Sequence, residues 1–188
     1  MSTIVVVRKN GKAVIAADTL TTCGNTKESA NYVVNHEKII EYKGNYFGVS
    51  GSASLQLAVQ SFLLETKKRF SLEKVNDIYK FGLTIHNELK EKHFLRADDD
   101  EDFETFRGDI LIANKFGIFG LSSYRYVQEY SKFYANGSGG EYALGAMFAV
   151  YNDEEKTAEN IAKIGVQAGT EFDDGSAAPI HSYTVKLK

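Results

Sequence analysis

Two apolar runs open the chain and predict its first hairpin. Small and β-branched apolar residues fill the stretches from Ile4 to Val7 and from Ala13 to Ala17, and Lys9-Asn10-Gly11 lies between them. Asn-Gly supplies the positive φ angles that a tight turn between antiparallel strands requires. Because both runs are almost wholly apolar instead of alternating, we expect both faces of each strand to be covered.

A second hairpin and a helix follow. Strands are predicted from Lys38 to Tyr42 and from Tyr46 to Ser50, around a turn at Lys43-Gly44-Asn45. Apolar residues at helical spacing then predict a helix from Ala53 to about Lys67. The polar stretch 19–37 before this hairpin is interpreted as a short strand or extended segment followed by a surface loop.

A second helix is predicted from Leu72 to about Phe94, with Ser71 as its N-cap. The apolar residues that helical spacing assigns to its buried stripe are Val75, Ile78, Tyr79, Leu83, Ile85 and Leu89. The acidic run 98–102 repels itself too strongly to pack, which predicts an exposed loop.

The second half repeats the order of strands and then helices. Its predicted elements are strands at Asp109 to Ala113 and Gly117 to Leu121, an extended segment at Tyr124 to Ala135, helices at Glu141 to Tyr151 and Lys156 to Gln167, a loop at 170–176, and a last strand at His181 to Lys188. Two antiparallel sheets stacked face to face, with helices outside, would bury both faces of the apolar strands. The sequence therefore predicts an α+β fold.

Composition narrows the class of protein. A chain of 188 residues predicts a single domain over 1–188, and the net charge of −3 gives no reason to expect a nucleic acid or a membrane surface as partner. The single cysteine, Cys23, cannot form an internal disulfide, which is typical of a reducing cytoplasm. No signal peptide and no apolar run of membrane-spanning length is present in the pattern.

Ser2 is the first candidate for chemistry. Serine after an initiator methionine is common and alone indicates nothing. If Met1 is removed, however, Ser2 carries a hydroxyl and a free α-amine on one residue at the start of a buried strand. An α-amine has a pKa of about 7.7–8.0, so part of it is neutral at cellular pH and can accept the hydroxyl proton. A hydroxyl nucleophile activated by its own terminal amine is an established covalent strategy.

Asp18 and Lys38 form a candidate pair. Asp18 ends an apolar strand, where a carboxylate without a partner would be costly, and Lys38 begins the second hairpin. One interpretation is a surface ion pair of little energetic weight. The other is a lysine whose charge lowers the pKa of the nucleophile.

Other residues support two interpretations each. Gly51 either allows a turn or presents its N–H to a developing oxyanion. Asp173 and Ser176 suggest an Asx-type turn when taken alone.

The run Gly137-Ser138-Gly139-Gly140 lacks the lysine and the spacing of a phosphate-binding loop. The four histidines show no metal-ligand spacing, and nothing around Cys23 marks it as activated.

Taken together, these residues resemble the proteasome β-subunit family, most closely its bacterial branch, which includes the HslV peptidase and bacterial proteasome homologues. The matching pieces are Ser2-Thr3-Ile4-Val5, Asn10-Gly11, Ala16-Ala17-Asp18, Gly24-Asn25-Thr26, Lys38-Ile39, Gly48-Val49-Ser50-Gly51-Ser52-Ala53, Gly137-Ser138-Gly139-Gly140 with Tyr142-Ala143, and Asp173-Asp174-Gly175-Ser176. They span the whole chain. The resemblance implies a four-layer αββα sandwich, the fold of N-terminal-nucleophile hydrolases.

The resemblance also implies a role for individual positions. Ser2 stands where the family places its N-terminal nucleophile, usually threonine. By the same register, the residues around it are Asp18 and Lys38 as the supporting ion pair, Gly51 as the oxyanion-hole amide, Ser138, Asp173 and Ser176 as the network that holds the terminal amine, and Thr21, His36, Val49 and Ala53 as the substrate pocket. The loop 27–37 is longer than the HslV spacing, so the register at Lys38 depends on an insertion.

The resemblance predicts a cytoplasmic peptidase that hydrolyses peptides or unfolded protein and needs no metal or organic cofactor. It implies homo-oligomeric double rings of six or seven subunits per ring, with an ATP-dependent unfoldase as a possible partner. Two alternatives stay open: an N-terminal-nucleophile amidase acting on a small amide or peptide, and a non-catalytic, proteasome-like structural subunit in which Met1 is retained.

Overall fold

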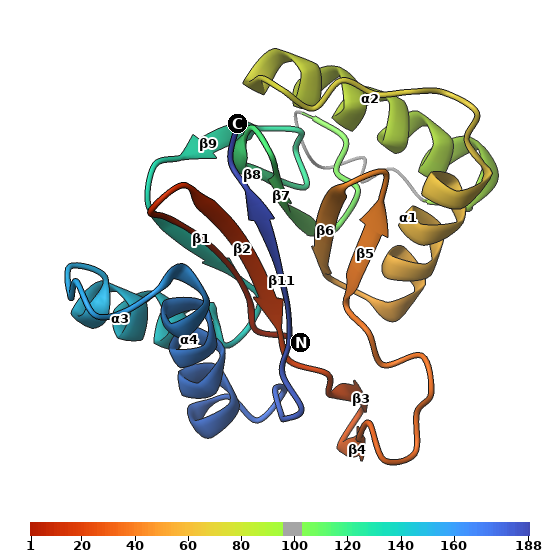
Figure 1. The fold of residues 1–188 in the computed structure, drawn as a ribbon. Coiled ribbons are helices and arrows are strands. Elements are labelled where there is room, and N and C mark those ends of the chain that lie inside the picture. The colour runs from red at the N-terminus through yellow and green to blue at the C-terminus, as the bar shows by residue number, and fades with distance from the viewer. Residues whose placement is uncertain (96–102) are drawn as a thin grey trace.

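The computed structural model describes residues 1–95 and 103–188 and consists of two stacked sheets between helices (Figure 1). The predicted acidic loop at 98–102 lies outside the described residues. In chain order the elements are β1 (Ile4–Lys9), β2 (Lys12–Ala17), β3 (Thr21–Cys23), β4 (Thr26–Glu28), β5 (Ile39–Tyr42), β6 (Asn45–Ser50), α1 (Ala53–Glu65), α2 (Val75–Lys92), β7 (Asp109–Asn114), β8 (Gly117–Leu121), β9 (Val127–Tyr130), β10 (Phe133–Asn136), α3 (Gly140–Val150), α4 (Ala158–Phe172) and β11 (His181–Lys186).

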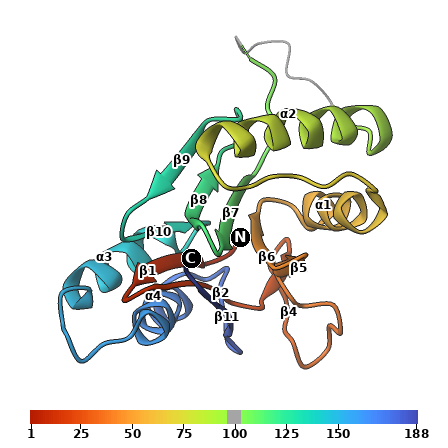
Figure 2. The same ribbon diagram turned by 45° about the horizontal axis from the view of Figure 1, so that its top comes forward.

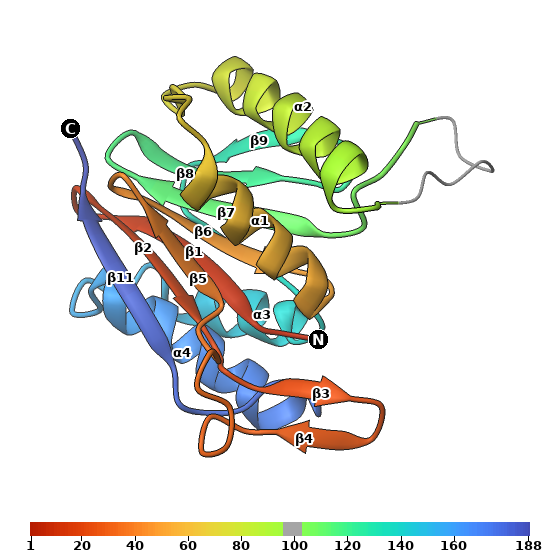
Figure 3. The same ribbon diagram turned by 90° about the vertical axis from the view of Figure 1, so that its right-hand side faces the viewer.

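The two main sheets are antiparallel throughout. One has the order β10-β1-β2-β11 and the other the order β5-β6-β7-β8-β9, while β3 and β4 form a separate small hairpin. Helices α3 and α4 cover the outer face of the first sheet, and α1 and α2 cover the second (Figures 2 and 3). The predicted α+β, four-layer αββα sandwich is therefore confirmed.

The first strand shows why its sequence is apolar without alternation. Ile4 and Val6 belong to the core between the two sheets, whereas Val5 and Val7 belong to the core beneath α3 and α4. All four side chains are fully buried. At the turn that follows, Asn10 and Gly11 have φ angles of 50° and 73°, as predicted from the Asn-Gly pair.

The second helix departs from its prediction. It begins at Val75, its N-cap is Lys74, and no side chain caps it; Ser71 instead donates a hydrogen bond to Asp77 at 2.9 Å. The buried residues of this helix are Ile78, Phe81, Gly82, Ile85, His86 and Leu89. Val75, Tyr79 and Leu83, which the spacing assigned to the buried stripe, are between 41 and 44% exposed.

The remaining elements agree with their predictions more closely. Helix α4 runs on to Phe172, so the first part of the predicted loop 170–176 is helical. The predicted extended segment of 124–135 contains β9 and the start of β10. In the part of the chain that the structure describes, no helix is both long enough and apolar enough to span a membrane.

Candidate active site

Ser2 lies just before β1 at one end of the sandwich and is 4% exposed. Its N–H donates to the Ser138 hydroxyl at 3.2 Å, and its own hydroxyl donates to the carbonyl oxygen of Met1. The Ser2 carbonyl in turn accepts a hydrogen bond from the Gly139 N–H at 3.2 Å. The main chain at Ser2 is therefore fixed from both sides by the segment that joins β10 to α3.

The glycines of that segment allow it to approach the N-terminus closely. A Cβ on Gly137 would lie 2.1 Å from the Ser2 carbonyl oxygen, and one on Gly139 would lie 2.0 Å from Oγ1 of Thr3. Gly137 also has a φ of +93°, a value that favours glycine. The glycine run thus serves backbone packing against Ser2 and Thr3.

Asp173 ties this end of the site together. Its Oδ2 accepts hydrogen bonds from the hydroxyls of Ser138 at 2.8 Å and Ser176 at 2.6 Å. Since the Ser176 hydroxyl donates there, it accepts from Oγ1 of Thr3 across a 2.8 Å contact. Asp173 is the C-cap of α4, so the end of that helix places the network against Ser2. The predicted residues Ser2, Ser138, Asp173 and Ser176 are brought together.

Asp18 and Lys38 form a buried ion pair. The Lys38 ammonium lies 2.8 Å from Asp18 Oδ1, and the two side chains are 6% and 0% exposed. The interpretation as a surface ion pair is therefore wrong. Asp18 also accepts main-chain N–H groups from Thr3 at 2.9 Å, Leu20 at 2.9 Å and Ala177 at 3.2 Å. These bonds satisfy both carboxylate oxygens and fix the start of β1 beside the lysine.

Burial dominates the electrostatics of Lys38. Desolvation lowers the pKa of the ammonium below its ordinary value, while the charge and hydrogen bond of Asp18 act in the opposite direction. A buried lysine that lines a cavity and has a lowered pKa is a feature found disproportionately at functional sites.

Gly51 follows β6 and has a φ of +143°, outside the range that other residues readily adopt. A Cβ at this position would lie 3.0 Å from Leu55 Cδ2 and 3.1 Å from the main-chain oxygen of Arg107. Both the backbone angle and the space therefore require glycine. Ser52 comes next and caps α1 by accepting the Leu55 N–H at 3.1 Å.

A cavity of about 230 Å³ opens beside Ser2. Its lining residues are Met1, Ser2, Leu20, Thr21, Thr22, Lys38, Val49, Gly51, Ser52, Ala53 and Gln56. Three of the four predicted pocket residues, Thr21, Val49 and Ala53, lie here together with the proposed nucleophile. His36 is not among them.

His36 belongs to a neighbouring polar cluster. Its ring lies 5.4 Å from the ring of His181, and its Nδ1 is 2.6 Å from the Val33 carbonyl oxygen. Glu37 contacts His181 Nδ1 at 2.5 Å and accepts the Tyr183 hydroxyl at 3.0 Å. The placement of His36 in the substrate pocket stays a prediction without a contact to support it.

Sequence reasoning missed Thr3 and Gln56. The Thr3 N–H and hydroxyl contact Asp18 and Ser176, so this residue joins the two halves of the site. Gln56 lines the cavity and donates to the main-chain oxygen of Glu37, directly before Lys38. Its position one turn into α1, three residues beyond Ala53, is the only signal that pointed to it.

The described residues also include the chain's histidines and its one cysteine, which are the usual metal ligands beside carboxylates. Among residues 1–95 and 103–188, no cluster of three or more His, Cys, Asp or Glu side chains could hold a metal ion. Cys23 is exposed and free. The groups present at the described site are hydroxyls, the buried Asp18–Lys38 ion pair, the Asp173 carboxylate, the Gln56 side-chain amide and main-chain amides.

The chain is similar to known proteins over most of its length. No protein-family profile matches the chain. The chain is 26% identical to a proteasome subunit beta of Nanoarchaeum equitans (strain Kin4-M), covering all of this chain and 94% of that protein. It is 28% identical to the ATP-dependent protease subunit HslV of Sulfurihydrogenibium sp. (strain YO3AOP1), covering 91% of this chain and 89% of that protein.

Solved structures give a stronger likeness. Thiobacillus denitrificans BPH is 45% identical with a TM-score of 0.95, covering 99% of this chain and 98% of that chain. A structure of BPH in complex with epoxomicin has the same identity and a TM-score of 0.93, with 99% of both chains covered. Eukaryotic HslV from Trypanosoma brucei has the same fold, with a TM-score of 0.66 at 19% identity over 98% of this chain and 99% of that chain.

Proposed function

The chain belongs to the proteasome β-subunit family of N-terminal-nucleophile hydrolases, which includes HslV-like peptidases, and we propose that it hydrolyses peptide bonds with Ser2 as its nucleophile. The proposal requires removal of Met1, because only then does Ser2 carry a free amine. The small serine side chain suits removal of Met1 by a methionine aminopeptidase.

One observation carries the proposal. The Ser2 nitrogen donates to Ser138 Oγ, which in turn donates to Asp173, and Ser2 itself is 4% exposed. After loss of Met1 this nitrogen becomes the α-amine, already held by a hydroxyl that a carboxylate orients. A terminal residue normally frays unless it is tied down, and a terminal nucleophile must be held still to react.

The proposed reaction begins with attack of Ser2 Oγ on the peptide carbonyl. The hydroxyl proton passes to the Ser2 amine, directly or through a water molecule, and the amine then protonates the leaving nitrogen. Lys38, held by Asp18, lines the same cavity as Ser2, and its positive charge favours the deprotonated hydroxyl and the neutral amine. Water then hydrolyses the ester that links the acyl group to Ser2 and restores the hydroxyl.

Gly51 is the proposed oxyanion donor. It lines the cavity beside Ser2, and its strained φ of +143° orients its peptide group in a way that no other residue would readily reproduce. A main-chain N–H fixed before reaction stabilises developing charge without reorganisation. Val49 and Ala53 give the cavity an apolar wall, which favours an apolar substrate residue before the cleaved bond.

The comparisons support the choice of chemistry. BPH, at 45% identity, was solved in complex with epoxomicin. Epoxomicin is a peptide epoxyketone, and this group forms its ring adduct with a hydroxyl and a free amine carried by one residue. Serine in place of the usual threonine keeps both groups, so we propose the same reactivity for Ser2.

We further propose that the chain acts in a cytoplasmic ring assembly. The relatives named as a proteasome subunit and as a subunit of an ATP-dependent protease support closed homo-oligomeric rings and a separate ATP-driven unfoldase. A chamber would restrict the peptidase to unfolded substrates that can enter it.

Intact mass, peptidase activity and light scattering test the function together. The native chain should lack Met1, cleave a fluorogenic peptide with an apolar residue before the cut, degrade casein and have the molar mass of a ring assembly by light scattering. Ser2→Thr should retain cleavage, whereas Ser2→Ala should lose it. Retention of Met1 with no cleavage would favour a structural subunit. Cleavage of small amides by a monomer that leaves casein intact would favour the amidase alternative.

A further inference from the structure

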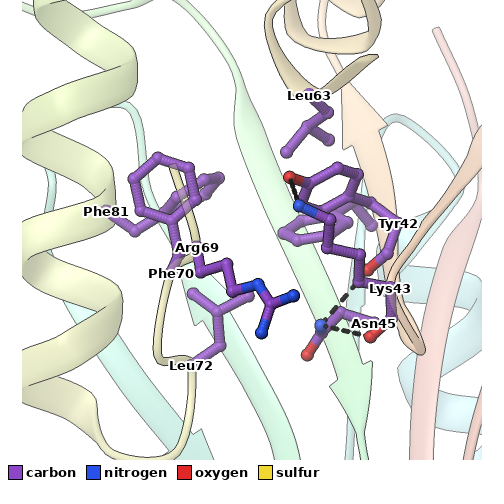
Figure 4. A pocket seen from close by; sticks show the side chains of 9 residues that line it. Tyr42, Lys43, Asn45, Leu63, Arg69, Phe70, Leu72 and Phe81 are labelled. Atoms are coloured by element: carbon purple, nitrogen blue, oxygen red, sulfur yellow. Dashed lines mark hydrogen bonds between the residues drawn. The ribbon is translucent and has the colours of Figure 1, made fainter. Parts of the chain in front are cut away.

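A second cavity, of about 430 Å³, lies at the far end of the β5–β6 hairpin from Gly51 (Figure 4). Its walls come from the hairpin turn, from the end of α1, from the connection between α1 and α2, and from α2 itself. The lining residues are Tyr42, Lys43, Asn45, Phe47, Leu63, Arg69, Phe70, Leu72 and Phe81. None of the residues assigned to the catalytic site takes part.

The floor of this cavity is apolar and aromatic. Phe47 and Leu63 are fully buried, and Phe81 is 1% exposed. The ring of Phe70 meets that of Phe81 edge-on, with centroids 5.1 Å apart, and Phe81 also lies 5.6 Å from Phe47. A ligand entering here would place an apolar or aromatic group against ring faces and edges, a contact that adds to simple burial.

The rim of the cavity is cationic. Lys43 and Arg69 are both exposed, and no carboxylate is present among the nine lining residues. The Lys43 ammonium sits 4.4 Å from the centroid of the Tyr42 ring and donates to the Tyr42 hydroxyl. Glu41, the acidic residue nearest in sequence, uses its carboxylate to accept the Gly44 N–H at 2.9 Å. The rim therefore offers an anion two positive charges and no competing negative charge from the lining.

Arg69 is the most distinctive of these groups. Figure 4 shows its guanidinium pointing from the α1–α2 connection toward the turn at Lys43 and Asn45. Within the described part of the chain, no ion pair engages this guanidinium. A planar guanidinium presents parallel N–H donors that match the two oxygens of a carboxylate.

We propose that this cavity binds a small-molecule monocarboxylate whose acid group is attached to an aromatic or compact aliphatic body. The carboxylate would meet Arg69, with Lys43 adding its charge, while the body packs on Phe70 and Phe81. The volume lies at the lower end of the range of about 300–1,000 Å³ that small-ligand pockets occupy. Five of the nine lining residues are apolar, and the charged groups lie at the rim, a combination that is also found in such sites.

Distance along the hairpin separates this site from Ser2. Tyr42 and Lys43 stand at the turn, whereas Lys38 and Gly51 stand at the open end of the same hairpin. The two sites can therefore be occupied at once, and the proposal does not depend on Ser2 being the nucleophile.

Isothermal titration calorimetry on the assembled protein tests the proposal with 3-phenylpropionate as the probe. Its neutral amide, 3-phenylpropanamide, has nearly the same shape and lacks the charge. We expect the acid to bind at least tenfold more tightly than the amide. Arg69→Gln should weaken acid binding at least tenfold, while Lys67→Gln, which removes one charge from the same connection but not from the lining, should change it less than twofold.

Three results would overturn the proposal: no heat of binding for the acid, equal affinity for acid and amide, or unchanged affinity in Arg69→Gln. Because Arg69 is exposed, its substitution should leave the thermal unfolding midpoint unchanged, and this is measured alongside. Protein treated with a peptide epoxyketone should bind the acid with the same affinity as untreated protein. Loss of binding after that treatment would place the probe at Ser2 and contradict a separate site.

Discussion

The Lys38 ammonium lies 2.8 Å from the Asp18 carboxylate, with both side chains almost completely buried beside Ser2. A second ion pair in the molecule, Lys12 with Glu159, has the same 2.8 Å separation, but its side chains are 49% and 32% exposed. Because the two pairs have the same separation but differ in exposure, comparing them measures the energetic effect of burial within one chain.

Lys38→Met should destabilise the protein by about 3–5 kcal/mol, because it leaves the Asp18 carboxylate buried without its counter-charge. Lys12→Met should change the free energy of unfolding by less than about 1 kcal/mol, since water screens that pair. Urea unfolding of both variants gives the comparison. Peptidase activity should fall by about 10²–10³-fold in Lys38→Met alone, because the charge that favours the deprotonated Ser2 hydroxyl is lost. Equal destabilisation by the two substitutions would contradict the importance of burial.

Ser138→Ala should reduce kcat with little change in KM, because it removes the group that holds the Ser2 amine without reshaping the substrate cavity. Its cost in stability should be about 1 kcal/mol, the usual effect of one hydrogen bond. Ser131→Ala, at an exposed turn, is the control and should leave both quantities unchanged. An unchanged kcat in Ser138→Ala would remove this hydroxyl from the proposed network.

Gly51→Ala should be more harmful than Gly44→Ala, although both glycines have positive φ angles. At Gly44 a Cβ meets nothing within 4 Å, so only the backbone preference is lost, about 1–2 kcal/mol. At Gly51 the Cβ would crowd Leu55 and Arg107 in addition. Peptidase assays should show a loss of kcat in Gly51→Ala only. Comparable kcat in the two variants would count against Gly51 as the oxyanion donor.

His86 should make stability depend on pH. Burial lowers its pKa, and the nearby Arg125 lowers it further, while Glu104 opposes both effects. As pH falls through about 6.5, the unfolded chain takes up the proton before the native histidine does, so the native state loses stability. His86→Gln should therefore lose less stability than the wild type between pH 8 and pH 5, measured by urea unfolding. His93→Gln, at the C-cap of the same helix, is the matched control. A wild-type-like pH dependence in His86→Gln would contradict this account.

Local patterns were sufficient for much of the fold. Asn10-Gly11 specified the first turn, and the unbroken apolar strand before it correctly indicated covering layers on both sides. The burial of α2 was harder to predict. Its sequence carries two neighbouring apolar stripes, one through Ile78 and Ile85 and another through Tyr79 and Leu83. The stripe that faces the sheet includes Gly82, where a Cβ would lie 2.8 Å from Leu121. No local pattern encodes that contact.

The candidate site was likewise predictable from the sequence only in part. Asp18 at the end of an apolar strand indicated a cationic partner, and the structure supplies Lys38. Nothing local indicated that Thr3 would contact Ser176, because that contact depends on where α4 ends. His36 was assigned to the substrate pocket by register alone, whereas its ring lies beside His181 on β11. Residue spacing does not predict contacts between segments that lie far apart in the sequence.

The central claim is that Ser2, freed of Met1, is the nucleophile. Intact-mass spectrometry after incubation with epoxomicin tests it most directly, because the epoxyketone of epoxomicin requires a hydroxyl and a free amine on one residue. Wild-type chain lacking Met1 should gain the mass of one inhibitor, Ser2→Thr should gain the same mass, and Ser2→Ala should gain none. A wild-type chain that has lost Met1 and still forms no adduct, or an adduct that persists in Ser2→Ala, would contradict the claim.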